Sequence, residues 1–199
     1  MGAFSTARAS VANLVATCLL VWTAWGTPVR VRAQGSRPDE GRGLSWGASF
    51  GAPIVLGAVA DAAGRPLGLL EPGGGAEGRI GYELPGGLAL GLVAGVFAHA
   101  SSTTRALTSY RGALEARWTI ETGTVVAPTL AAGLGVDLEQ FERGLAATGY
   151  GRLWVGTQWL LDSWFSLDLG ATLEASIPGD AFRDAVAWVC PQIGVTFHE

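Results

Sequence analysis

The segment His99-Ala100-Ser101 places a histidine and a serine two residues apart, a pairing that could do chemistry. A histidine can take the proton of a serine hydroxyl, so that the serine attacks an acyl carbon, provided that an acid orients the imidazole ring. No acid is well placed for this role, and the parity of the surrounding strand turns His99 inward. We therefore expect ordinary polar residues at the mouth of a loop here, and no enzyme.

A larger set of charged residues falls on one face of segments that alternate apolar and polar residues. In segment 110–120 one face carries apolar residues and the other carries Arg111, Glu115 and Arg117. Segment 165–177 repeats the pattern, with Asp168 and Glu174 on its polar face. Side chains of a strand point to opposite faces in turn, so each segment has one apolar face and one charged face.

This alternation predicts a transmembrane β-barrel. Beyond the N-terminal segment, no stretch of eighteen apolar residues is free of Gly-Gly or proline, as a membrane-spanning helix would require. A membrane protein without such helices needs a closed barrel, because open sheet edges cannot face lipid. The fold class expected is all-β, an eight-stranded antiparallel up-and-down barrel.

The eight strands are expected to alternate short and long connections. The first strand covers 44–51, and Ile54, Leu56 and Ala58 offer an extension of its alternation. The others cover 77–84, 88–99, 109–120, 124–136, 149–160, 164–177 and 185–197. Tight turns are expected at 84–87, 121–123 and 161–163, and longer loops at 53–76, 100–108, 137–148 and 178–184. Short turns on one side and long loops on the other are typical of outer-membrane barrels, whose short turns are periplasmic. Pro128 and Pro191 lie inside strands, where we expect bulges.

An eight-stranded barrel is just wide enough to be filled by side chains. The inward charged residues expected are four basic and four acidic, namely Arg79, Glu83, Arg111, Glu115, Arg117, Arg152, Asp168 and Glu174. Isolated charges at low dielectric are costly, so these residues should pair. We expect Arg152 to pair with Glu174, and Glu83 or Asp168 to be partners for the arginines of 110–120. The result would be a neutral polar plug.

Aromatic residues support the same topology. Six outward aromatics are expected at the periplasmic ends of the strands: Trp46, Tyr82, Trp118, Trp159, Phe165 and Phe197. Aromatic side chains favour the membrane interface, where barrels carry them as girdles. The outer rim is sparser, and Tyr110 is its clearest member.

The N-terminus has the features of a signal peptide. Arg8 precedes the apolar segment 11–25, and a cleavage site of small residues follows at Ala33, with Gly26 as an alternative. We expect residues 1–33 to be removed, 34–43 to form a flexible leader and 44–199 to form the barrel. Cleavage after Ala33 would remove three arginines and no acid, which changes the net charge from −4 to −7. This charge argues against nucleic acid as a partner.

Metals and cofactors have little support in the sequence. One cysteine, Cys190, remains after cleavage, so neither an internal disulfide nor a cysteine-cluster metal site is expected. The only histidines are His99 and His198. Asp137, Glu139 and Glu142 lack the glycine and regular spacing of a calcium loop, and we expect a solvated acidic loop there. We expect no metal and no cofactor.

Over residues 44–197 the chain resembles the small eight-stranded outer-membrane barrels of the OmpA transmembrane-domain and OmpX type. The last strand, 187–197, resembles the C-terminal signal by which the assembly machinery of these barrels recognises its clients, with His198 and Glu199 following the terminal aromatic residue Phe197. The resemblance implies a monomer in the outer membrane of a Gram-negative bacterium, in contact with lipids including lipopolysaccharide. The His99-x-Ser101 segment is similar to that of lipid A deacylases, with Ser102 at the position of their asparagine.

The function expected is structural or interactive, with recognition carried by loops 53–76 and 137–148. One alternative is a narrow channel or carrier for a small or apolar solute. Weaker alternatives are a lipid-modifying enzyme with His99 and Ser101, a soluble lipocalin-like barrel that buries its apolar face, and a bundle of helices through 84–98 and 125–138.

Overall fold

A computed structural model describes residues 43–56, 59–60, 64, 70–99, 107–141, 144–178 and 184–199. The expected signal peptide and almost all of the expected leader lie outside these residues, but Gly43 already belongs to the first strand. Within the described residues, no helix is long and apolar enough to cross a membrane.

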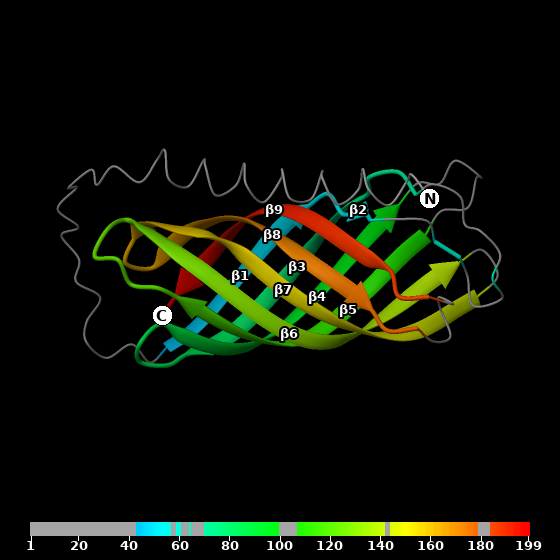
Figure 1. Ribbon diagram of the computed structural model, residues 1–199. Helices are drawn as coiled ribbons and strands as arrows, with labels where there is room; N and C mark the ends of the chain where they lie inside the picture. Colours follow the sequence, from blue (N-terminus) through cyan, green and yellow to red (C-terminus); the bar gives the residue numbers. More distant parts are fainter. Residues whose placement is uncertain are drawn as a thin grey trace. The chain divides into compact units, whose positions relative to one another are not determined.

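The described residues form nine strands (Figure 1). They are β1 (Gly43–Gly51), β2 (Ile54–Val55), β3 (Gly74–Glu83), β4 (Leu88–His99), β5 (Leu107–Thr119), β6 (Val126–Phe141), β7 (Gly144–Asp162), β8 (Phe165–Ser176) and β9 (Ala187–His198). Each strand from β3 to β8 pairs antiparallel with the next one in the chain. All eight strands expected from the alternation are present.

The sheet closes on itself because β1 pairs with both β3 and β9. In Figure 1 the cyan β1 lies beside the red β9. The short β2 also pairs with β9, in the same register as β1, so β1 and β2 are one strand interrupted at Ala52 and Pro53. The prediction of a closed, antiparallel, eight-stranded barrel is therefore confirmed.

The strands are staggered around the barrel. A path that steps from each residue to its paired residue on the next strand starts at Ser45 and returns to the first strand at Val55, ten residues further along the chain. The residues on this path are Gly81, Gly91, Glu115, Gly133, Arg152, Glu174 and Trp188. Such a stagger means that the strands tilt against the barrel axis. Paired residues on neighbouring strands consequently lie at different heights, and this difference decides which charges meet inside.

The two ends of the barrel differ. We call the end with the connections 84–87, 120–125 and 163–164 the turn end, and the opposite end the loop end. At the loop end one expectation is wrong. Segment 137–148 is not a long loop, because β6 and β7 remain paired out to Phe141 and Gly144. The alternation of inward and outward residues simply continues through Asp137 and Glu139.

The expected bulges at Pro128 and Pro191 are also absent. The register of β6 with β7 is constant through Pro128, and that of β8 with β9 is constant through Pro191. The carbonyl of Pro128 accepts from Ile120 just past the end of β5, and that of Pro191 accepts from Ala52 in the gap between β1 and β2. The side of each proline that lacks an N–H donor thus faces a position where the neighbouring strand has ended. No hydrogen bond between paired strands is lost there, so no bulge is needed.

The outer surface is apolar and the inner surface is polar. Leu134, Leu114 and Phe50 are 73%, 69% and 65% exposed, whereas nine charged residues of the strands are buried inside. A lipocalin-like barrel would have the opposite arrangement, and the strands occupy both segments considered for helices. Both of those alternatives are therefore wrong.

Candidate functional site in the barrel lumen

The middle of the lumen is organised around Arg152 on β7. Its guanidinium lies 2.9 Å from Glu77 on β3 and 3.2 Å from Glu115 on β5. Glu174 is its partner in the register of β8, as expected from the sequence, but the two charged groups are 4.0 Å apart. The shorter contacts cross the lumen rather than the sheet, because the stagger brings Glu77 and Glu115 to the height of the arginine.

Arg111 on β5 forms the next layer toward the loop end. It pairs with Asp137 at 3.0 Å and with Glu174, and both carboxylates are almost fully buried. Its guanidinium also lies over the rings of Phe97 and Trp188, at 4.7 Å and 5.5 Å from their centroids. Cation–π contacts of this kind are strongest where water is excluded.

A third layer lies nearer the turn end. Arg79 is 2.5 Å from Asp168 and also donates to Thr196. Arg117 is 3.3 Å from Glu115 and 3.9 Å from Asp168, with its guanidinium over the ring of Trp154. Glu115 and Asp168 therefore each bind two arginines, and Glu115 joins this layer to Arg152.

Three inward carboxylates, Glu77, Asp137 and Glu139, are not among those predicted from the alternation. The described lumen consequently holds seven carboxylates and four arginines instead of four of each. Glu77 lies two residues before Arg79 on β3 and therefore on the same face of the strand. Extending the alternation of β3 by two residues would have predicted it. Asp137 and Glu139 were assigned to a solvated loop, which is wrong. Glu139 is fully buried on β6 and accepts from Ser109 at 2.7 Å.

Apolar residues close the loop end of the lumen. Val59, Leu107, Val186 and Trp188 form a buried cluster, with Val55, Leu70 and Ala146 packed against it. We call these seven residues the loop-end cap. His99 lies beside it with its ring 4.8 Å from that of Trp188, and is 1% exposed. Ser101, the other member of the candidate catalytic pair, lies outside the described residues.

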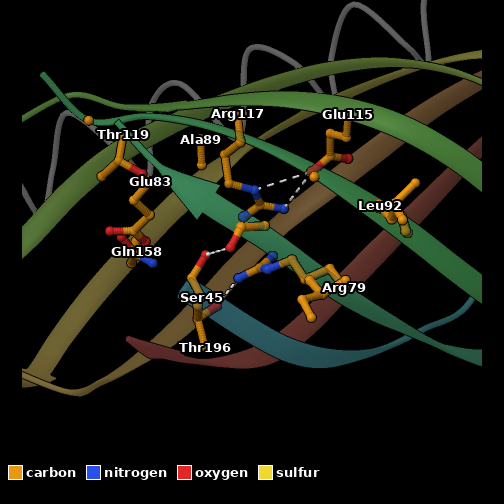
Figure 2. A pocket seen from close by; sticks show the side chains of 15 residues that line it. Ser45, Arg79, Glu83, Ala89, Leu92, Glu115, Arg117, Thr119, Gln158 and Thr196 are labelled. Carbon is orange, nitrogen blue, oxygen red and sulfur yellow. Dashed lines mark hydrogen bonds and ion pairs between the residues drawn. The ribbon is translucent and has the colours of Figure 1, made fainter. Parts of the chain in front are cut away.

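A cavity opens at the turn end instead. It contains about 500 Å³ of empty space, part of it continuous with the outside. Its polar lining comes from five strands and includes Ser45, Arg79, Glu83, Arg117, Gln158 and Thr196 (Figure 2). No group of three or more histidine, cysteine or acidic side chains in the described part of the chain could hold a metal ion.

All six predicted interface aromatics lie near the turn end. Trp46, Tyr82 and Trp118 are about half exposed, and Trp159, Phe165 and Phe197 are less so. The ring of Phe197 stacks on Trp46 at 4.2 Å and contacts Phe165 at 5.4 Å. This packing joins β1, β8 and β9 where the barrel closes.

Comparisons with solved structures agree with this architecture. The chain is similar to Neisserial surface protein A (TM-score 0.62, 13% identity, 77% of this chain and 96% of that one). It is also similar to the outer membrane protein OprG from Pseudomonas aeruginosa (TM-score 0.50, 11% identity, 80% and 97%). No protein-family model and no curated protein matches the sequence. At these identities the likeness shows the fold, which is that of the small eight-stranded outer-membrane barrels.

Proposed function

We propose that this chain is an integral outer-membrane protein with a closed lumen, whose role is structural or lies in interactions at the cell surface. The apolar exterior supports the location, because large exposed side chains such as Leu114 and Leu134 need hydrocarbon around them. The turn end would face the periplasm and the loop end the outside. Lipids including lipopolysaccharide would surround a monomer.

The observation that carries the proposal is the stack of ion pairs across the lumen. It runs without a break from Arg79 and Asp168 through Arg117, Glu115 and Arg152 to the pairs of Arg111. The loop-end cap adds a cluster of buried apolar side chains at the loop end of this stack. A solute would have to break several buried pairs to pass, so this arrangement favours a plug over a channel.

Conductance in planar lipid bilayers tests the closed lumen. Wild-type protein should insert and give no steady current, because the ion pairs fill the lumen. Folding is checked on the same sample by its change of migration on SDS gels after boiling, and insertion by co-flotation of the protein with lipid vesicles. Large, steady currents from the folded protein would instead support the alternative of a narrow channel.

The location is tested separately by cell fractionation. The protein should be found with the outer membrane and should need detergent for extraction. Recovery in the periplasmic wash would contradict the proposal. Recognition by the barrel-assembly machinery, through the strand that ends at Phe197, is part of the same proposal and predicts that Phe197→Ala lowers the amount of folded protein in that fraction.

A further inference from the structure

Four polar side chains from four different strands meet at the turn end of the lumen. The Oγ of Ser166 on β8 lies 3.1 Å from Nε2 of His198 on β9, and Nδ1 of the same ring lies 2.7 Å from Oε1 of Glu83 on β3. Nε2 of Gln158 on β7 donates to Ser166 Oγ at 2.9 Å. The chain of contacts thus runs from carboxylate to imidazole to hydroxyl to amide.

These contacts have the order that an activated serine requires. In the tautomer with hydrogen on Nδ1, the His198 ring donates to Glu83 and its Nε2 can accept the hydroxyl hydrogen of Ser166. The carboxylate then orients the ring and stabilises the imidazolium that forms when the ring takes the serine proton. This assembly is separate from the His99 and Ser101 pair considered in the sequence.

The cavity at the turn end adjoins this group. Glu83, Gln158 and Thr196 line it, and Figure 2 places Gln158 close to Glu83 at one end of the lining. Gln158 therefore contacts Ser166 with its amide nitrogen and also borders the cavity. Its Oε1 has no hydrogen-bond partner among the described residues although the side chain is buried. An amide in this position can donate to an oxyanion that forms beside the serine.

We propose that Ser166, His198 and Glu83 form an acyl-transfer site that takes small, uncharged esters entering through the turn end. Uncharged substrates are favoured because the charges of the lining are already paired, as Arg79 with Asp168 and Arg117 with Glu115. This activity goes beyond the proposed structural role and does not depend on it.

The reaction balances with water as the only co-reactant. Ser166 Oγ forms a bond to the ester carbonyl carbon while its proton passes to His198 Nε2, and Gln158 donates to the carbonyl oxygen as it becomes negative. The bond to the alcohol then breaks and the alcohol takes the proton from His198. Water, activated by the same imidazole, hydrolyses the acyl-serine and restores the hydroxyl.

Access limits the substrate and the rate. Ser166 is fully buried, whereas the side chains of His198 and Glu83 are 7% and 21% exposed. An entering ester must therefore break the hydrogen bond from Gln158 to Ser166 Oγ, and the amide nitrogen released in this way stays beside the serine, where it can donate to the carbonyl oxygen. We therefore expect slow turnover and a strong preference for the shortest acyl groups.

The test uses the folded full-length barrel in detergent and a short-chain alkyl fluorophosphonate without a fluorophore, which reacts with activated serines and is detected by the mass that it adds. Wild-type protein should be labelled, and mass spectrometry should place the label on Ser166. Ser166→Ala should remove the labelling, and Glu83→Gln should slow it about tenfold or more, because the ring is no longer oriented by a carboxylate. Hydrolysis of a short-chain nitrophenyl ester should fall in parallel.

Ser176→Ala is the matched control, since Ser176 is another buried, inward serine of β8, and among the described residues its hydroxyl bonds to the backbone of Val186 alone. This variant should label like wild type. Folding of every sample is verified by its change of migration on boiling. Folded wild-type protein that stays unlabelled, or equal labelling of Ser166→Ala, overturns the proposal and leaves these four residues with a structural role alone.

Discussion

Arg152 shows how much a single lumen residue can hold together. Its side chain is 1% exposed and contacts carboxylates from three other strands, Glu77, Glu115 and Glu174. A buried carboxylate without its partner is costly, because neither water nor another charge compensates it. The arginine therefore links β3, β5, β7 and β8 through the middle of the barrel.

Arg152→Met should lower the free energy of unfolding by about 3–5 kcal/mol, because it leaves buried carboxylates without their partner. Urea unfolding in lipid vesicles, followed by tryptophan fluorescence, measures the change. Arg79→Met is the comparison and should cost less, since that side chain is 18% exposed. A loss below about 1 kcal/mol for Arg152→Met would show that the central network contributes little.

Glycines inside the wall make room for large inward side chains. A Cβ on Gly156 would lie 2.3 Å from the carbonyl oxygen of Leu169 and 2.4 Å from the ring of Trp154. Gly156→Ala should therefore destabilise the barrel by about 1–3 kcal/mol, as overpacking does. Gly78→Ala is the control, because a Cβ there meets nothing closer than 3.8 Å. Equal unfolding midpoints for the two variants would contradict the packing around Trp154.

At the scale of the elements, β6 and β7 form a hairpin that extends past β8. The pairing of β7 with β8 ends at Tyr150 and Ser176, whereas its pairing with β6 continues to Gly144. Outward residues along this hairpin should consequently pass from the hydrocarbon at Leu134 to water near Leu145. Both side chains are well exposed, at 73% and 61%.

Arginine substitutions measure this change of environment. Leu134→Arg should destabilise the folded barrel in lipid by about 2–4 kcal/mol, and Leu145→Arg by about 0–1 kcal/mol, because the cost of a charge falls with distance from the bilayer midplane. Urea unfolding in vesicles provides both values. Equal losses of stability for the two variants would mean either that Leu145 also lies in the membrane or that Leu134 lies outside it.

At the scale of the whole molecule, closure between β1 and β9 removes the last free edges of the sheet. Seven residue pairs join the two strands, and Trp46 stacks on Phe197 across them. A closed barrel satisfies its backbone polar groups internally, which open strands in lipid cannot do.

Closure predicts resistance to SDS. Unboiled protein should migrate differently from boiled protein, because the closed sheet survives the detergent until it is heated. A variant truncated before Ala187 lacks β9 and should migrate alike in both conditions. If the truncated chain still migrated differently before and after boiling, closure by β9 would not be the cause of the SDS resistance.

The alternation of residues is a local property, and for this reason the sequence was sufficient to predict the eight strands, their inward and outward faces and the tight turns. The sequence was not sufficient where a strand continues into charged residues, as at Asp137 and Glu139. It was also not sufficient for the prolines, because their effect depends on whether the neighbouring strand ends beside them.

The partners inside the lumen depend on the tertiary structure. Arg152 meets Glu77, and Ser166 meets His198 and Glu83, only because closure and a stagger of ten residues bring strands distant in the chain to the same height. The sequence by itself determined which side chains face inward, since parity follows from the strand alone. Only the closed barrel decided which of them touch, because height around a tilted, staggered sheet is a property of all eight strands together.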